Sequence, residues 1–297
     1  MAKAATTPHQ PALLSRGGYS DRGLQREQNE DAYALPPAHA DEARLGTLVV
    51  VADGVGSLGG GKEASWDAVQ YLQALYYAKT GAEHPAERLR ECVEAVNLLN
   101  RATQQWLGQN GERLTTLVAA VIYNESIWVA NVGDSRAYLV QAKGEQIYQL
   151  TEDHTVKAGF YDHVELAINQ KGAITQAIGL EEQCQVDIYH YRWQPGDRLV
   201  LCSDGLASLA GATIAKLALG YPPEIATGAL VAQANKEDGS DNSTAVIVGW
   251  EAGPVSTPAQ EQTRRWPGSV ILRNDLVPLV LGLIMGWLIL VIFLLSG

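Results

Sequence analysis

The sequence lacks the marks of several common protein classes. Its three cysteines, Cys92, Cys184 and Cys202, are odd in number and do not have the spacing of metal ligands. Two of them stand in apolar surroundings, so we expect buried free thiols in a reducing compartment. No internal repeat and no low-complexity tract is present, and Met1 to Ser15 contains no apolar h-region of a secretory signal.

Positive charge is also scarce. The chain has 22 Lys and Arg against 33 Asp and Glu, a formal net charge of -11, and the phosphates of a nucleic acid would be repelled by it. Much of this acidity is expected on a solvated surface, so it says little about the substrate. With 297 residues and 46% apolar content, the chain can form one large domain or two small ones with a real core.

One long apolar run stands out at the carboxyl end. Leu276 to Leu295 carries no charge, and about 20 such residues are what the core of a bilayer requires. A buried helix of a soluble core is the weaker alternative, because only Ser296 and Gly297 follow to cover it. We therefore predict a transmembrane anchor over residues 276–295.

The charges around this run predict its orientation. Arg264, Arg265 and Arg273 precede it and no basic residue follows, so the positive-inside tendency places the preceding domain in the cytoplasm. Gly282 and Gly286 have the spacing that lets two such helices approach closely, which leaves dimerisation through the anchor as an open alternative.

The remainder reads as alternating strands and helices. Apolar runs predict strands over Leu48–Ala52, Leu117–Tyr123, Ile127–Asn131, Ala137–Val140, Ile147–Leu150, Arg198–Ser203 and Thr244–Trp250. Helical spacing predicts helices over Lys62–Lys79, Pro85–Leu107, Ala212–Leu219 and Pro223–Asn235. Hairpins, helices and further strands in this order favour an α+β layered domain over a doubly wound parallel sheet. We expect a mobile amino terminus at 1–15, a domain at 16–250 and a linker at 251–275 before the anchor.

Four short aspartate motifs carry the chemistry. They are Asn29-Glu30-Asp31, Asp53-Gly54, Ser203-Asp204-Gly205 and Asp241-Asn242-Ser243-Thr244. The middle two follow apolar runs, so each carboxylate is expected just past the end of a buried strand. Carboxylates that converge repel one another unless cations neutralise them, and clusters of oxygen ligands select Mg²⁺ or Mn²⁺. Paired ions suit in-line attack of a metal-bound hydroxide on phosphorus.

In this order the motifs resemble the metal-dependent serine/threonine protein phosphatases, the phosphatase 2C family, in their bacterial form. The resemblance runs from about Tyr19 to Gly249. Its further pieces are Ser20-Asp21-Arg22-Gly23 with Arg26, Thr115-Thr116-Leu117, Ala130 to Tyr138, Leu150 to Thr155, and Ile174 to Gly179. Asp-Gly alone is usually a turn, but seven pieces in sequence order are specific. The resemblance implies a four-layer α/β/β/α sandwich of two mainly antiparallel sheets flanked by helices, with a metal cleft at one edge.

The resemblance also implies a dinuclear centre. Asp53 matches the carboxylate that bridges both ions, and the carbonyl of Gly54 completes one site, where a glycine allows close backbone approach. Asp204 and Asp241 match the carboxylates that hold the second ion and, through water, the first. Glu30 and Asp31 match acidic residues that contact the metals mainly through water. A turn, a cap or a surface acid is the alternative for each.

Two further residues match the family's motifs. Arg26 matches the arginine that clamps the substrate phosphate, since a guanidinium fork suits bidentate contact, and a surface salt bridge is its alternative. Asp134 matches an aspartate that holds a weaker third metal in bacterial relatives, although Gly-Asp-Ser is also good turn material. Arg136 is expected to support that turn rather than to touch substrate.

The general acid is left open by the sequence. His154 has a suitable side chain, but we expect a structural role for it and protonation of the leaving group by metal-bound water. The chain departs from the family at Val55 to Leu58, where relatives usually have Gly-Gly-His after the Asp-Gly motif. It also departs at the flap between His154 and Ile174, which is shorter and lacks the usual basic patch. Substrate choice is therefore less defined than the metal centre.

The resemblance implies a phosphatase for phosphoserine and phosphothreonine on proteins, with two Mn²⁺ or Mg²⁺ ions and a weaker third. Together with the apolar run and the arginines before it, the prediction is a membrane-anchored enzyme whose catalytic domain faces the cytoplasm. Its substrates would be those of a serine/threonine kinase. Two alternatives stay open, namely a non-catalytic phosphoprotein-binding scaffold on the same fold and a phosphatase of a small phosphorylated metabolite. Loss of an acidic ligand would mark the scaffold, and none of the core aspartates is missing.

Overall fold

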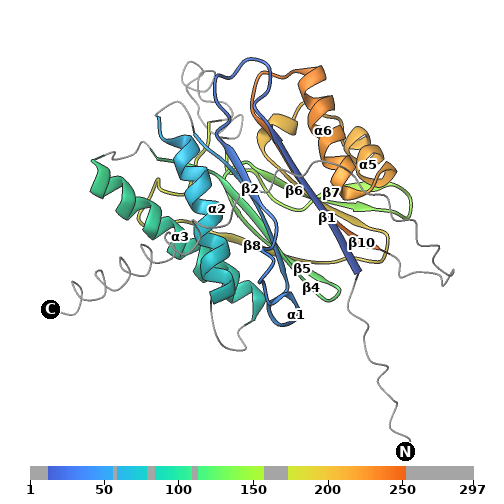
Figure 1. The fold of residues 1–297 in the computed structure, drawn as a ribbon, viewed down its shortest axis with the longest axis horizontal. Helices are drawn as coiled ribbons and strands as arrows, with labels where there is room; N and C mark the ends of the chain where they lie inside the picture. Colours follow the sequence, from blue (N-terminus) through green and yellow to red (C-terminus); the bar gives the residue numbers. More distant parts are fainter. Residues whose placement is uncertain (1–12, 56–58, 79–83, 109–112, 157–172, 252–297) are drawn as a thin grey trace, which may run out of the picture. The chain divides into compact units, whose positions relative to one another are not determined.

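A computed structural model of the chain describes residues 13–55, 59–78, 84–108, 113–156 and 173–251. All of these belong to the first of two compact units, Met1–Gly253. Their strands form two five-stranded sheets in which every neighbouring pair is antiparallel, with helices on the outer faces (Figure 1). The predicted sandwich of two antiparallel sheets flanked by helices is confirmed.

The first sheet has the strand order β1-β10-β9-β6-β7. Its strands are β1 (Leu13–Asp21), β10 (Ser243–Glu251), β9 (Arg198–Cys202), β6 (Arg136–Gln141) and β7 (Gln146–Gln149). Helices α5 (Gly211–Gly220) and α6 (Pro223–Glu237) pack on its outer face, and the short 3-10 helix η2 (Asp204–Leu206) follows β9 directly.

The second sheet has the order β2-β3-β4-β5-β8. Its strands are β2 (Asp31–Ala34), β3 (Thr47–Asp53), β4 (Leu117–Tyr123), β5 (Ser126–Val132) and β8 (Asp187–Arg192). The long helices α2 (Gly61–Ala78) and α3 (Pro85–Leu107) cover its outer face, and the short helix α1 (Glu42–Leu45) precedes β3.

Strand β3 shows why this sequence forms the middle of a sandwich. Val49 and Val51 point into the layer between the two sheets, while Leu48, Val50 and Ala52 point into the layer under α2 and α3. Because both faces are covered, the strand is apolar along nearly its whole length rather than alternating with polar residues. Only its last residue, Asp53, is charged, and it stands where the strand reaches the edge of the core.

The elements predicted from apolar runs lie where expected, within one or two residues at most ends. Three strands were missed, namely β1, β2 and β8. Gly17 and Gly18 weaken the pattern of β1, but the fold requires them, since a Cβ on Gly17 would lie 2.4 Å from the Pro223 carbonyl oxygen. β1 begins at Leu13, three residues before the predicted domain start at residue 16, and pairs with β10 along its full length.

The predicted anchor at 276–295 and the linker at 251–275 fall almost entirely outside the described residues, which end at residue 251. Within the part of the chain that is described, no helix combines the length and the apolar character needed to cross a bilayer.

Candidate active site

Two carboxylates from neighbouring strands stand side by side at one end of the second sheet. Asp31 is the first residue of β2 and Asp53 the last of β3, and the antiparallel register pairs them directly. Such pairs project to the same face with close Cβ atoms. The backbone of Asp53 is fixed by Thr116, whose Oγ1 accepts from the Asp53 N–H at 3.0 Å and whose N–H donates to the Asp53 carbonyl at 2.8 Å.

The first sheet brings a third carboxylate to the same place. Asp204 opens η2 one residue after β9, and its carboxyl lies close enough to that of Asp53 for its charge to help raise the pKa of Asp53. Ser203, between β9 and η2, donates from Oγ to the Asp31 Oδ2 at 2.7 Å. Ends of strands from both sheets therefore meet at one acidic cluster, which we define as Asp31, Asp53, Asp134 and Asp204.

The carboxyls of the acidic cluster have raised pKa values in the absence of a cation. Burial raises the pKa of Asp31 to about 7, with hydrogen bonds from Thr244 and Ser203 opposing and the charge of Asp204 adding to the shift. Burial and the charges of Asp31, Asp204 and Asp134 raise the pKa of Asp53 well above its usual value. Burial and the charge of Asp241 likewise raise the pKa of Asp204. All three shifts have the same cause, because buried carboxylates that lie close together disfavour one another's charged form.

Unpartnered oxygens mark what the cluster is suited to bind. Asp31 Oδ1, Asp134 Oδ1 and Asp204 Oδ1 are buried and have no hydrogen-bond partner. Among the described residues, no group of three or more Asp, Glu, His or Cys side chains is arranged so that it could hold a metal ion as it stands. The donor set nevertheless fits hard divalent cations, because it consists of carboxylate oxygens whose lone pairs are unused and whose charges repel.

Arg26 lies near the cluster and pairs with Asp241. Its Nη2 donates to Asp241 Oδ2 at 2.7 Å, and this ion pair joins the loop after β1 to the loop before β10. The charges of Asp53 and Glu30 are also close enough to help raise the pKa of Arg26, after the larger effect of its hydrogen bond to Asp241. Glu30 in turn has a pKa raised by burial, with Arg26 opposing. The guanidinium is about half exposed, so a ligand can reach it.

Gly54 has a packing reason to be glycine. A Cβ there would lie 2.3 Å from the Gly61 carbonyl oxygen and 2.7 Å from the Glu30 carbonyl oxygen. The Gly54 N–H donates to that same Glu30 oxygen at 3.1 Å. The first turn of α2 and the Glu30 segment can therefore come up against the end of β3 only where no side chain stands between them.

Asp134 belongs to the tight connection between β5 and β6. Burial, then the charge of Asp204, raises its pKa to about 6, and its side chain is nearly enclosed. Gly133 beside it has a φ of 108°, a conformation that other residues avoid. Arg136 forms a forked pair with Asp153, with Nε and Nη2 both donating to Oδ2, the latter at 2.7 Å, as expected for a residue that supports the turn.

His154 is engaged at both ring nitrogens. Nδ1 accepts from the Gly133 N–H at 3.2 Å, so the proton lies on Nε2, which faces Asp187 Oδ2 at 3.1 Å. The ring thus connects β8 to the turn that carries Asp134. This geometry agrees with the structural role expected for it.

The sequence did not reveal the hydrogen-bonding side chains that assemble the site. Asn242 holds three backbone groups of the segment 22–30, and Ser203 links Asp31 to the Thr244 N–H. Thr116 supports Asp53 and bonds Ser135 at 2.7 Å. The four supporting residues belong to motifs noted in the sequence, but their partners lie 19 to 220 residues away. They are Asn242, Ser203, Thr116 and Ser135. The departures at residues 56–58 and most of the flap lie outside the described residues.

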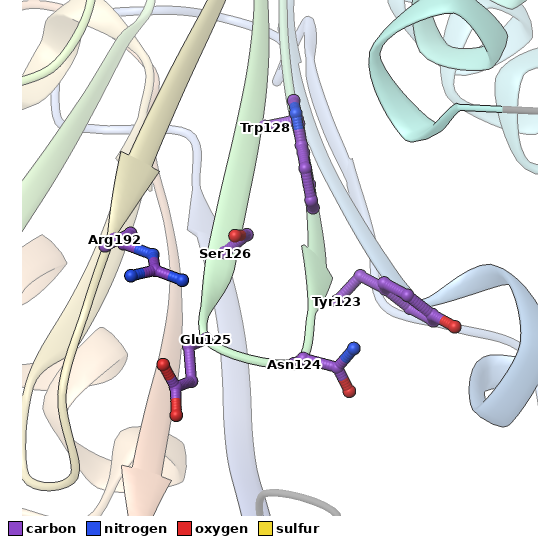
Figure 2. A pocket seen from close by; sticks show the side chains of 6 residues that line it. All are labelled: Tyr123, Asn124, Glu125, Ser126, Trp128 and Arg192. Carbon is purple, nitrogen blue, oxygen red and sulfur yellow. The ribbon is translucent and has the colours of Figure 1, made fainter.

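A concavity lies at the opposite end of the second sheet from Asp53, at the β4–β5 turn (Figure 2). It is lined by Tyr123, Asn124, Glu125, Ser126, Trp128 and Arg192. The Trp128 ring stacks on His190 with ring centroids 4.9 Å apart. Because β4 starts beside Thr116 and runs seven residues to Tyr123, this pocket is roughly 20 Å from the acidic cluster, and no predicted site residue lines it.

Fold and site together define an antiparallel α/β/β/α sandwich whose two sheets meet at an acidic cluster beside an exposed arginine. The sequence model of the family Protein phosphatase 2C matches residues 23–239 of this chain. The chain therefore belongs to the protein phosphatase 2C family, in its bacterial branch, and is a phosphoric monoester hydrolase.

Individual relatives agree. The chain is 32% identical over 243 residues to the serine/threonine phosphatase stp of Listeria monocytogenes, covering 77% of this chain and 93% of that protein. It is 32% identical to the protein phosphatase PhpP of Streptococcus pneumoniae, with 77% and 94% covered. Among solved structures, the catalytic domain of the serine/threonine protein phosphatase PstP in complex with two manganese ions matches with a TM-score of 0.64 at 26% identity, covering 80% of this chain and 99% of that one.

Proposed function

We propose that the chain hydrolyses phosphoserine and phosphothreonine on proteins, with two Mn²⁺ or Mg²⁺ ions held at the acidic cluster. The observation that carries the proposal is the group of buried carboxylate oxygens without partners, on Asp31, Asp134 and Asp204, beside the exposed Arg26. The names of the relatives, serine/threonine phosphatases, and the two manganese ions of the PstP structure support it.

The proposed ligands follow from the positions of the carboxylates. Asp53 lies between Asp31 and Asp204 and is suited to face both ions, with the Gly54 carbonyl beside it. Asp204 and Asp241 would hold the second ion, and Glu30 and Asp31 would act through water. Asp134 would contribute to a weaker third site. When bound, the ions acidify the attacking water and offset the charge on the phosphoryl oxygens.

Arg26 is the residue proposed to hold the phosphate. In this structure it is paired with Asp241, so binding of a phosphate requires the guanidinium to exchange that carboxylate for phosphoryl oxygens. The exchange is favourable if Asp241 is neutralised at the same time by a cation. A planar fork with two parallel N–H groups also fixes the orientation of the phosphorus for in-line attack. Because both nitrogens of His154 are engaged, the departing alkoxide takes its proton from water.

The test compares the wild type with Asp53→Asn, which keeps the size of the side chain and removes its charge. We expect hydrolysis of an aryl phosphate and of a phosphoserine peptide that depends on manganese in the wild type and is lost in the variant. A wild type as inert as Asp53→Asn in manganese would favour the non-catalytic scaffold instead. Faster hydrolysis of phosphosugars than of phosphopeptides would favour the metabolite phosphatase.

We also propose that the chain is anchored in a membrane through 276–295, with the phosphatase domain in the cytoplasm and its substrates among those of a serine/threonine kinase. The support is the uncharged run from Leu276 to Leu295 and the arginines before it. The spacing of Gly282 and Gly286 supports pairing of two anchors. Removal of residues 276–297 should release an active domain from the membrane fraction; a truncated protein that still sediments with membranes would contradict the anchor.

A further inference from the structure

The side chain of Asn242 joins the turn before β10 to the segment 22–30. Its Nδ2 donates to the carbonyls of Arg22 at 2.8 Å and Gln28 at 2.9 Å, and its Oδ1 accepts from the Glu30 N–H at 2.8 Å. The residue is only 4% exposed, and each of its polar side-chain atoms has a partner. One side chain therefore fixes three backbone positions along this segment.

The segment held in this way carries the arginine. Arg26 lies between the two carbonyls that Asn242 binds, while its guanidinium reaches Asp241, the residue next to Asn242. Within the segment, the Leu24 N–H donates to the Gly239 carbonyl at 2.8 Å and the Arg22 Nη1 donates to the Glu27 carbonyl at 3.2 Å. Asn242 is the side chain that holds the segment at three backbone positions on both sides of Arg26.

We propose that Asn242 is a positioning residue for phosphate recognition, acting through Arg26. It holds the segment 22–30 so that the guanidinium stays over the acidic cluster after it leaves Asp241 for a phosphoryl group. This inference rests on the proposed role of Arg26 as the phosphate clamp. It assigns to Asn242 an effect on substrate binding rather than on general stability.

The chemistry of the side chain explains the choice of residue. A primary amide offers two donors and one acceptor in a single plane, and here it meets two carbonyls and one N–H. An aspartate would present no donor to the two carbonyls, and an alanine would leave three backbone groups without a partner. A mobile arginine must be ordered each time substrate binds, and a displacement of about 1 Å in a positioning element can change rates by as much as about 100-fold.

The chain contains a matched control. Asn97 on α3 is 1% exposed and makes the same three kinds of contact, with Nδ2 donating to the carbonyls of Glu181 at 3.0 Å and Glu182 at 3.2 Å and Oδ1 accepting from the Gly179 N–H at 2.7 Å. It fixes a loop that carries no residue of the site. Asn97→Ala therefore removes an equivalent set of hydrogen bonds without disturbing Arg26.

The experiment is a double-mutant cycle on the full chain, with manganese at saturation and a phosphoserine peptide as substrate. We expect Asn242→Ala to raise KM about tenfold with kcat changed less than about threefold, and Asn97→Ala to leave both unchanged at a temperature where each variant is folded. In an Arg26→Ala background, Asn242→Ala should change KM less than about twofold, because the group it positions is gone. The inhibition constant of inorganic phosphate should follow the same pattern.

Failure of the inference is separable from failure of the proposed function. If Arg26→Ala leaves KM unchanged, the clamp itself is wrong. If Arg26→Ala raises KM but Asn242→Ala behaves like Asn97→Ala, or adds its full effect in the Arg26→Ala background, the positioning role is wrong. Should Asn242→Ala not fold, Asn242→Ser gives the same comparison. Hydrogen exchange of the Glu30 amide should accelerate in the Asn242 variants and not in Asn97→Ala, with or without manganese; an unchanged rate would contradict the proposal.

Discussion

At the scale of single residues, the protonation of the acidic cluster makes the stability of the folded chain depend on pH. The pKa of Asp31 is raised to about 7 and that of Asp134 to about 6, against a usual value of 3.8 for each. Between pH 4 and 7 the folded chain therefore binds more protons at these groups than the unfolded chain does. The resulting stabilisation is present at low pH and is lost as the pH rises through the folded-state pKa values.

This predicts how the metal-free protein responds to pH. In the presence of a chelator, its free energy of unfolding should fall by on the order of a few kcal/mol between pH 5 and pH 8, and its melting temperature should fall with it. Asp187, whose pKa is lowered by His154 and Gln185 against the opposing effect of burial, titrates below this window and does not mask the trend. Asp31→Asn should make the dependence of the melting temperature on pH less steep, and a melting temperature that rises with pH without metal would refute this description.

Manganese should raise the melting temperature more at pH 8 than at pH 5, because its ligands must be deprotonated.

His154 provides a second prediction at the same scale. Replacing it by Ala leaves the Gly133 N–H without an acceptor, so we expect a loss of about 1–3 kcal/mol in the free energy of unfolding. Activity measured below the melting temperature should fall less than about tenfold, whereas loss of a general acid removes about 100- to 10,000-fold. A loss in that larger range, with the limb of the pH–rate profile shifted, would show that His154 transfers a proton.

At the scale of elements, close packing of turns decides where the carboxylates stand. Gly205 follows Asp204 in η2, and a Cβ there would lie 1.9 Å from the Asn242 carbonyl oxygen and 2.7 Å from the Ser243 Oγ. The turn that carries Asp204 and the turn that carries Asp241 are therefore in direct backbone contact. Any side chain at position 205 must push them apart.

Gly205→Ala should accordingly lower the free energy of unfolding by about 1–3 kcal/mol and weaken manganese binding, measured by denaturant titration and calorimetry. Gly228→Ala in α6 is the matched control, since nothing lies within 4 Å of its added Cβ and alanine is favoured there by about 1 kcal/mol. Equal effects of the two substitutions would mean that the contact between the turns is unimportant.

The elements also show what the sequence could predict. β3, β4 and β9 were predictable because both faces of each strand are covered, which produces continuous apolar runs. β2 has only four residues and β1 contains two glycines, so neither carries a pattern that a propensity argument can detect. Their strand identity comes from pairing with β3 and β10, which is a tertiary effect.

At the scale of the whole molecule, the sandwich explains how distant motifs form one site. The start of β2 and the end of β3 lie beside the end of β9 and the turn before β10, so four segments from both sheets bring together Asp31, Asp53, Asp204 and Asp241. Asp53 and Asp204 were predicted just past strand ends from the apolar runs before them, whereas Asp31 and Asp241 were predicted from the order of the motifs along the chain. Their supports, such as Asn242 and Ser203, could not, because a side-chain hydrogen bond across 172 or more residues leaves no local pattern.

Among the described residues no complete group of metal ligands surrounds one point, and the charges of the site explain why. Burial and neighbouring carboxylates raise the pKa of Asp53, and Asp241 is paired with Arg26. Close carboxylates repel one another in the absence of a cation. Binding of two divalent cations should offset this repulsion and release Arg26 from Asp241.

The most direct test of the dinuclear centre is anomalous diffraction at the manganese edge from crystals of the phosphatase domain grown with manganese. We predict two strong peaks within coordination distance of Asp53, one of them also contacted by Asp204 and Asp241, with Arg26 released from Asp241. Peaks absent from the acidic cluster at saturating manganese, or found only elsewhere on the molecule, would contradict the account.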